Sequence, residues 1–366
     1  MRLGMFMMPV HPPDRTFWST LDEDTEKSLL ADQLGFDEVW LGEHFSANTE
    51  PIPSAMMFFA NLVARTKNIS FGTAVINIPN HNPVIVAAEC AQFDHMSKGR
   101  FLMGVGPGGL VSDFELFKNP DVHARNRMVV EAVSMIQQIW SQDPPYDLKG
   151  EFWNISLKDG IDAKLGIGYM PKPYQQPGPP VFISLASPNS SSAKTAALKG
   201  WGMLSANIIP TYSVASHWTV FSEACKAAGI KPSGDKWRVA RNMMVAPTDA
   251  EAEERVFSEP ASNNYFYTYL REVLSKVGLL VILKPRADMP DAEATVEAIT
   301  RECVLYGSPR TVLDKLIAFR DRVGPFGGLL MTGIDWGGKN RDWENESMRL
   351  LVQDVMPKFR QHTMAE

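Results

Sequence analysis

The chain has 366 residues, of which 45% are hydrophobic and 21% are charged. This ordinary globular composition excludes a disordered or fibrous protein and is enough for one large core or two domains. The formal net charge is −6 and no long basic block is present, so we expect no nucleic-acid partner.

The three cysteines, Cys90, Cys225 and Cys303, lie far apart and show neither a disulfide framework nor metal-binding spacing. We therefore expect reduced thiols and no metal site. The first residues contain an apolar run too short for a signal peptide, and no window reaches the roughly 18 apolar residues of a membrane span. These features predict a cytoplasmic protein without a membrane partner.

Short apolar runs alternate with helical stretches along the chain. The expected strands cover residues 2–8, 38–43, 69–76, 100–105, 181–186, 202–207, 237–246 and 327–333. The expected helices cover residues 22–35, 83–99, 124–141, 190–200, 219–229 and 308–324. This α/β pattern predicts a (β/α)8 TIM barrel, and a doubly wound open sheet is the alternative, because alternation alone does not show closure.

Two connections are longer than a minimal barrel needs, at about 142–180 and 257–302. The first is rich in proline, glycine and aromatic residues, and the second follows the seventh expected strand. Long structured insertions are often lids or binding loops. We predict a single barrel domain over residues 1–366 that carries both insertions, with 257–302 as the lid.

In a (β/α)8 barrel, the groups that handle ligands lie at the carboxyl ends of the strands and in the loops that follow. This rule collects Met8, His11, Glu43, His44, Ile76, Asn77, residues 106–109, residues 187–192 and residues 333–336. The chain has no metal, serine-hydrolase or Walker-type motif, and GVGPGG at 104–109 has the wrong spacing for a dinucleotide loop.

Three features at these strand ends have two interpretations each. His44 is either an acid or base or a histidine satisfied by its neighbours. The glycines at 106, 108 and 109 either admit a flat ligand to the backbone or form a sharp turn. Arg125, at the start of a helix, is either a phosphate clamp or an exposed cation.

The stretch SPNSSS at 187–192 connects a buried strand to a helix. Serine and asparagine are preferred helix N-caps, and a helix N-terminus also attracts anions through its free N–H groups. If Arg125 and this turn face one phosphate, the ligand is a phosphorylated cofactor.

Several segments together resemble the bacterial luciferase-like flavin monooxygenases, in chain order from residue 1 to about 359. They are EVWLGEHF (38–45), ISFGTAVINIPNHNPV (69–84), FDHMSKGRFLMGVGPGG (93–109), QQPGPPVFISLASPNSSSAKTAALKG (175–200), YGSPRTVLDKL (306–316) and VMPKF (355–359). The similarity skips mainly residues 257–302. The opening MRLGMFMMPVHPP is similar to the branch described as limonene-monooxygenase-like.

The resemblance implies a (β/α)8 barrel that binds FMN as reduced flavin from a separate flavin reductase. Reaction with O2 through a C4a-hydroperoxyflavin would then oxygenate an organic substrate. A small, mainly apolar or aromatic substrate is expected from the residues assigned to strand ends, which are Phe6, Met8, Phe58, Phe59, Trp201 and Trp336. His44 matches the family's strand-two histidine, and residues 74 and 75 match a non-prolyl cis peptide packed against the flavin. The expected flavin-binding residues are Ala74, Val75, Gly106, Arg125, Ser187, Ser190, Ser191 and Ser192, and the expected substrate-pocket residues are Met8, His11, Phe58 and Trp336.

This chain departs from luciferase itself at Gly106 and Pro107, where luciferase has a reactive cysteine and an arginine. The missing arginine removes one expected phosphate contact, and the missing cysteine argues against light emission. Two alternatives remain: a deazaflavin-dependent dehydrogenase or reductase of the same fold, and a non-catalytic flavin-binding partner subunit. We expect a homodimer, the commonest state among soluble oligomers.

Overall fold

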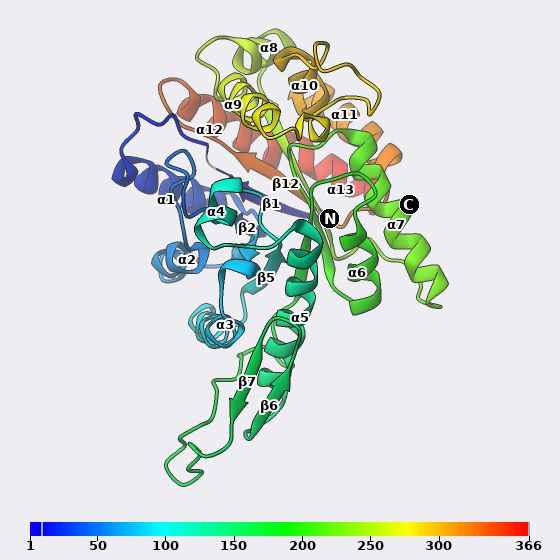
Figure 1. The fold of residues 1–366 in the computed structure, drawn as a ribbon. Coiled ribbons are helices and arrows are strands. Elements are labelled where there is room, and N and C mark those ends of the chain that lie inside the picture. The colour runs from blue at the N-terminus through cyan, green and yellow to red at the C-terminus, as the bar shows by residue number, and fades with distance from the viewer. Residues whose placement is uncertain (9, 365–366) are drawn as a thin grey trace. The chain divides into compact units, whose positions relative to one another are not determined.

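The structure is a computed structural model that describes residues 1–8 and 10–364. The chain divides into two compact units. Unit 1 comprises Met1–Trp40, Asn48–Glu50 and Ile183–Glu366, and unit 2 comprises Leu41–Ala47 and Pro51–Phe182. Each unit therefore holds part of the strand and helix series, which Figure 1 traces from the N-terminus to the C-terminus.

The strands of unit 1 pair in parallel around one long central strand. β10 (Trp237–Val245) pairs with β9 (Gly202–Ser205), with β11 (Val304–Gly307) and with β12 (Gly328–Gly333). β12 pairs on its other side with β1 (Arg2–Met7). All nine residues of β10 and all six of β12 are buried. β12 is mostly apolar, whereas β10 also buries Arg238, Arg241 and Asn242.

In unit 2, β5 (Phe101–Gly106) pairs in parallel with two short strands, β3 (Ser70–Thr73) and β4 (Ile76–Asn77). The strand expected at 69–76 is therefore interrupted at residues 74 and 75, which are joined by a cis peptide bond. Each expected strand is present, although the boundaries differ by a few residues.

Along the sheet, the strand order is β11-β10-β12-β1-β2-β3-β5-β8-β9, with β2 at Glu38–Leu41 and β8 at Val181–Leu185. The additional pairing of β9 with β10 closes this order into a ring. The expected closed (β/α)8 barrel is confirmed, and the open doubly wound sheet is wrong. β11, which the sequence interpretation missed, adds to β10 outside the ring.

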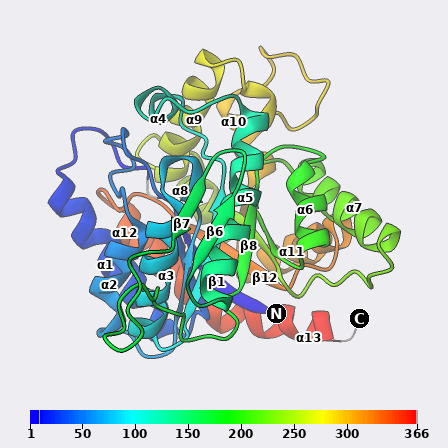
Figure 2. The same ribbon diagram turned by 60° about the horizontal axis from the view of Figure 1, so that its bottom comes forward.

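Helices separate the strands. Those of unit 1 are α1 (Phe17–Leu34), α6 (Ser191–Lys199), α7 (Thr211–Ala227), α8 (Asp249–Phe257), α9 (Ser262–Lys276), α10 (Val296–Cys303), α11 (Pro309–Val323), α12 (Asn340–Leu350) and α13 (Met356–Met364). Figure 2 shows α6 beside α7. α1 and α7 begin five and eight residues before their expected starts.

Unit 2 holds α2 (Ala55–Val63), α3 (Pro83–Ser97), α4 (Val111–Leu116) and α5 (Val122–Ser141). The insertion at 142–180 contains an antiparallel hairpin of β6 (Tyr146–Lys149) and β7 (Asn154–Leu157), which lies along α5 in Figure 1. Glu131 of α5 accepts hydrogen bonds from the backbone N–H groups of residues 151–153 and so fixes the hairpin turn.

The insertion at 257–302 is largely helical and carries α9 and α10. Its apolar residues join a buried cluster that includes Phe266, Tyr267, Leu270, Leu283 and Ile299. The insertion therefore packs into unit 1 through this apolar cluster, which also contains residues outside 257–302, such as Val10 and Met244. Among the helices of the described residues, none has the length and hydropathy of a membrane span.

Candidate active site

The end of β2 is tied to the end of β4 through Glu43. Its Oε1 accepts a 2.8 Å hydrogen bond from the Asn77 backbone N–H and lies 2.7 Å from Nε2 of His81. The side-chain amide of Asn77 donates a 2.8 Å hydrogen bond to the backbone carbonyl oxygen of Glu43. Glu43 is only 5% exposed, so this carboxylate fixes the backbone that precedes His44.

His44 lies beside a buried carboxylate from α4. Oδ2 of Asp113 is 3.9 Å from Nδ1 of His44 and accepts a 3.2 Å hydrogen bond from the Phe45 N–H. The Ser46 hydroxyl donates to the other oxygen of Asp113. The His44 side chain is 21% exposed, so the structure places a partly accessible imidazole next to a carboxylate that can orient it.

The Ala74–Val75 cis peptide packs closely against the residue that follows β2. A Cβ atom on Gly42 would lie 3.0 Å from the Ala74 carbonyl oxygen, and the Ala74 N–H donates to Leu41 O over 2.6 Å. The expectation of a cis peptide at residues 74 and 75 is confirmed. Its contact with a flavin stays a prediction.

The glycine loop after β5 accommodates an aromatic ring. Gly106 ends β5, and Gly108 has a φ of +78°, a conformation that favours glycine. A Cβ atom at Gly108 would meet the Phe114 ring at 3.2 Å. On that ring stacks the guanidinium of Arg125, 3.6 Å from the ring centroid.

Arg125 is 9% exposed, so the expectation of an exposed helix cation is wrong. Its Nη1 donates to Pro120 O over 2.7 Å, whereas its buried Nε has no hydrogen-bond partner among the described residues. Burial lowers the pKa of this guanidinium from its ordinary value. A buried cation with an unused donor is suited to a phosphate or another anion.

In unit 1, the SPNSSS stretch forms the predicted helix cap. Ser190 is the N-cap of α6, and its hydroxyl accepts a 3.3 Å hydrogen bond from the Ser192 N–H. Ser187 and Ser191 are exposed, and Ser192 is buried. The cap is confirmed, whereas a bound phosphate at this position stays a prediction.

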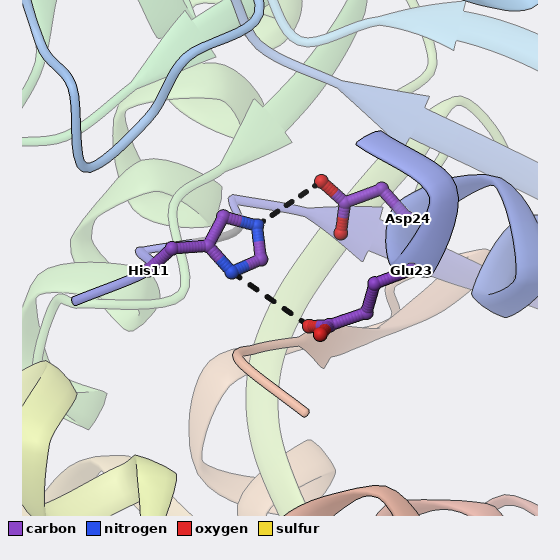
Figure 3. Close-up of side chains that lie close together, drawn as sticks. All are labelled: His11, Glu23 and Asp24. Atoms are coloured by element: carbon purple, nitrogen blue, oxygen red, sulfur yellow. Dashed lines mark hydrogen bonds and ion pairs between the residues drawn. The ribbon is translucent and has the colours of Figure 1, made fainter. Parts of the chain in front are cut away.

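His11 is held in a buried network of charges, which Figure 3 shows in part. Its Nδ1 lies 2.8 Å from Asp335 and 3.7 Å from Glu23, and its Nε2 lies 3.2 Å from Asp24. Arg15 bonds Glu23 and Asp335, each over 2.6 Å. Burial lowers the pKa of His11, but the hydrogen bonds to Asp24 and Asp335 outweigh it and raise that pKa to about 9.

The network also contains Lys27, whose Nζ is 3.6 Å from Asp24 and 4.0 Å from Glu344. Burial raises the pKa of Glu344 to about 7. One ligand atom each of His11, Glu23 and Asp24 lies within 4.8 Å of the others, a spacing that a metal ion can use. Cationic side chains already neutralise these carboxylates, so the donor set fits an ion-pair network better than a metal centre.

The remaining pocket candidates are spread over both units. His11 is 1% exposed with both ring nitrogens in the network, which is not the ligand-facing position expected for it. Trp336 packs over Lys27, Met8 packs on the apolar cluster around α9, and Phe58 packs beside Phe59 in unit 2. Whether they form one substrate pocket stays a prediction.

The structure therefore brings His44, Gly106, Arg125 and the cis peptide into unit 2, and the serine cap into unit 1. The joint clamp of Arg125 with the serines stays a prediction. The sequence interpretation missed Asp113, because the helix that carries it has only six residues and lacks a readable apolar period.

Residues 1–324 match the family described as luciferase-like monooxygenase. The chain belongs to this family. Among curated luciferase-like monooxygenases and their relatives, it is 28% identical over 362 residues to 4-hydroxyprotoasukamycin monooxygenase of Streptomyces nodosus subsp. asukaensis, covering 97% of this chain and 91% of that protein. It is 27% identical over 360 residues to limonene 1,2-monooxygenase of Rhodococcus erythropolis, covering 97% and 86%.

A solved structure of the oxygenating constituent of 3,6-diketocamphane monooxygenase from Pseudomonas putida, a type II Baeyer-Villiger monooxygenase in complex with FMN, superposes with a TM-score of 0.86. It is 24% identical and covers 98% of both chains. The oxygenase component of a flavin-dependent trigonelline monooxygenase from Acinetobacter baylyi is 25% identical, covering 98% of this luciferase-like monooxygenase and 96% of the relative. An F420-dependent secondary alcohol dehydrogenase has the same fold at a TM-score of 0.69 and 20% identity.

Proposed function

We propose that this protein is the oxygenase component of a two-component FMN-dependent monooxygenase. It would take reduced FMN from a separate flavin reductase, use O2 as co-substrate and oxygenate a small, mainly apolar or aromatic organic molecule. We further propose that it works as a homodimer. The full-length similarity to named monooxygenases supports this proposal, including one described as an oxygenase component.

The serine cap of α6 is the observation that carries the choice of FMN. Residues 186–193, ASPNSSSA, follow β8 directly and contain no carboxylate. Exposed hydroxyls and the N-terminus of a nine-residue helix form a donor set that suits a doubly charged phosphate. In unit 2, the unused Nε of Arg125 is a second donor of the same kind.

Residues of unit 2 would bind the reactants and exchange protons with them. Bound reduced flavin supplies the activation of O2. We assign to His44 the exchange of a proton at a ring nitrogen, and to Asp113 the orientation of that ring. The hydrogen bonds of Glu43 to Asn77 fix the strand end on which His44 stands, which keeps the imidazole in one place during turnover.

The test is an anaerobic titration of the purified protein with reduced FMN, followed by mixing with oxygenated buffer in a stopped-flow spectrometer. We expect saturable binding, and then a transient absorbance that belongs neither to reduced nor to oxidised FMN. Direct return to oxidised FMN, with or without candidate apolar substrates, would contradict a monooxygenase.

The F420-dependent relatives make a deazaflavin dehydrogenase the second candidate. The same titration with reduced F420 separates the two. Tight binding of F420, weak binding of FMN and no oxygen uptake would favour the dehydrogenase. The monooxygenase proposal expects the reverse order of affinities.

A further inference from the structure

We propose that His217 of α7 is a positioning residue for the cofactor phosphate, because it fixes the loop that leads into the N-terminus of α6. The inference rests on the proposed FMN function and adds a residue outside the serine turn. His217 itself does not reach the loop surface, since its side chain is fully buried.

A chain of three hydrogen bonds leads from the barrel interior to this loop. Nε2 of His217 lies 2.9 Å from Ser187 O, and Nδ1 lies 2.9 Å from the Ser205 hydroxyl at the end of β9. Nε1 of Trp237, the first residue of β10, donates to the same Ser205 oxygen over 2.9 Å. His217, Ser205 and Trp237 are all 0% exposed.

The directions of these bonds follow from the partners. A carbonyl oxygen only accepts, so Nε2 of His217 carries the proton that is donated to Ser187 O. Nδ1 is then the acceptor, and the Ser205 hydroxyl donates to it while its oxygen accepts from Trp237. Each of these buried polar groups is satisfied, which makes the arrangement a single defined geometry.

These hydrogen bonds influence the proposed phosphate site by fixing the orientation of the Ser187 carbonyl group. The oxygen of Ser187 carries partial negative charge and would repel a phosphate if it faced the α6 N-terminus. Its hydrogen bond to His217 points it at the ring instead. Burial lowers the pKa of His217 to about 4, so the ring is neutral near pH 7 and adds no positive charge of its own.

The neighbouring residue of α7 provides a second anchor. The Ser216 hydroxyl accepts a 2.8 Å hydrogen bond from the Asn189 N–H and donates to Ser213 O over 2.6 Å. Asn189 has a φ of 52°, in the left-handed region that few residues other than glycine, asparagine and aspartate adopt. Two consecutive residues of α7 therefore hold residues 187 and 189 on either side of Pro188.

Two substitutions of His217 separate its two hydrogen bonds. The amide of H217Q reaches about as far as Nε2 and can still donate to Ser187 O. The amide of H217N reaches about as far as Nδ1 and keeps only the contact with Ser205. The measurement is the dissociation constant of reduced FMN and of reduced riboflavin, which lacks the phosphate, for each variant under anaerobic conditions.

We expect wild-type protein and H217Q to prefer FMN over riboflavin to a similar degree. H217N should lose on the order of tenfold in FMN affinity, about 1.4 kcal/mol, with riboflavin affinity unchanged. S216A, which removes the second anchor from a half-buried position, should give a smaller loss confined to FMN. It also keeps the proposal testable if H217N fails to fold.

The outcomes distinguish failure of the proposed phosphate site from failure of the role assigned to His217. If wild-type protein binds FMN and riboflavin equally, the phosphate site of the proposed function is contradicted, whatever the His217 variants do. If the wild type prefers FMN and both H217N and S216A keep that preference, the positioning role of α7 is overturned. Equal loss of both ligands in H217N and S216A also overturns it, because that result reports general damage to the barrel.

Discussion

At the scale of single residues, His44 combines partial exposure with a fixed carboxylate neighbour, Asp113. We expect H44A to reduce substrate oxygenation by about 10²- to 10⁴-fold, the usual contribution of a general acid or base. Reduced-FMN affinity should stay near the wild-type value, because the substitution leaves the proposed phosphate donors in place. Single-turnover assays, with product counted per flavin oxidised, measure the two effects separately.

D113N is the matched control for that experiment. It keeps the size of the Asp113 side chain and an oxygen for the Phe45 N–H, but it removes the negative charge beside the imidazole. We expect a decrease smaller than that of H44A. An unchanged oxygenation rate in H44A would reduce His44 to a structural histidine.

Arg125 can be tested separately as a donor to the cofactor phosphate. R125M keeps apolar contact with Phe114 but removes the guanidinium donors. We expect reduced FMN to bind about 10- to 100-fold more weakly, as the loss of a charged hydrogen bond of about 1.5–3 kcal/mol predicts, and riboflavin to bind as before. A parallel loss for both ligands in a flavin titration would mean that Arg125 supports only the packing of the glycine loop.

At the scale of elements, the start of α6 can be tested without any ligand. The Ser190 hydroxyl caps the helix, whereas Ser191 follows the cap as the first helical residue and is exposed. S190A should lower the free energy of unfolding by about 1 kcal/mol, and S191A should change it by less than about 0.5 kcal/mol. Urea denaturation followed by circular dichroism measures both, and equal effects would contradict the assigned cap.

The strands were the most predictable elements, because short stretches rich in apolar residues, such as GLLMTG of β12, are buried throughout. The starts of α1 and α7 were misjudged, since neither Thr16 nor Pro210 provides a side-chain cap that marks the boundary. The break in the expected strand 69–76 has no local periodicity signal. The break itself was not predicted, and the cis peptide at residues 74 and 75 was expected only from the family resemblance.

The site was less predictable than the fold. His44, the cis peptide position and the serine cap stand at strand ends that the barrel rule identifies. The partners that define their geometry, Asp113 and His217, lie 69 and 30 residues away in sequence from His44 and Ser187. Such partners depend on tertiary packing, which a single sequence does not display.

At the scale of the whole molecule, the charge network around His11 ties α1 to the segment after β12. The ordinary pKa of 6.5 rises to about 9 in the folded state, so folded protein holds this proton more tightly than unfolded protein. The resulting stabilisation is complete below about pH 6.5 and disappears as pH rises through about 9. The pKa shift of His11 corresponds to at most about 3 kcal/mol of stabilisation, since each pKa unit is worth about 1.36 kcal/mol.

Urea unfolding at pH 6 and at pH 9.5 measures this dependence. Wild-type protein should lose stability over that interval, and H11Q should start lower at pH 6 and change less. H123Q, which alters an exposed histidine, should follow the wild-type pH dependence. An identical pH dependence in H11Q would show that His11 does not carry the proton that stabilises the network.

The pairing of β1 with β12 has a consequence for biosynthesis. Arg2 lies opposite Gly328, so the first strand of the barrel meets this neighbour only after the residues between them have been made. At ribosomal speeds of about 5–20 residues per second, roughly 15 seconds to a minute separate the two events. During that interval, the mostly apolar β1 has one edge without its partner, and an unpaired strand edge of this kind is prone to aggregate.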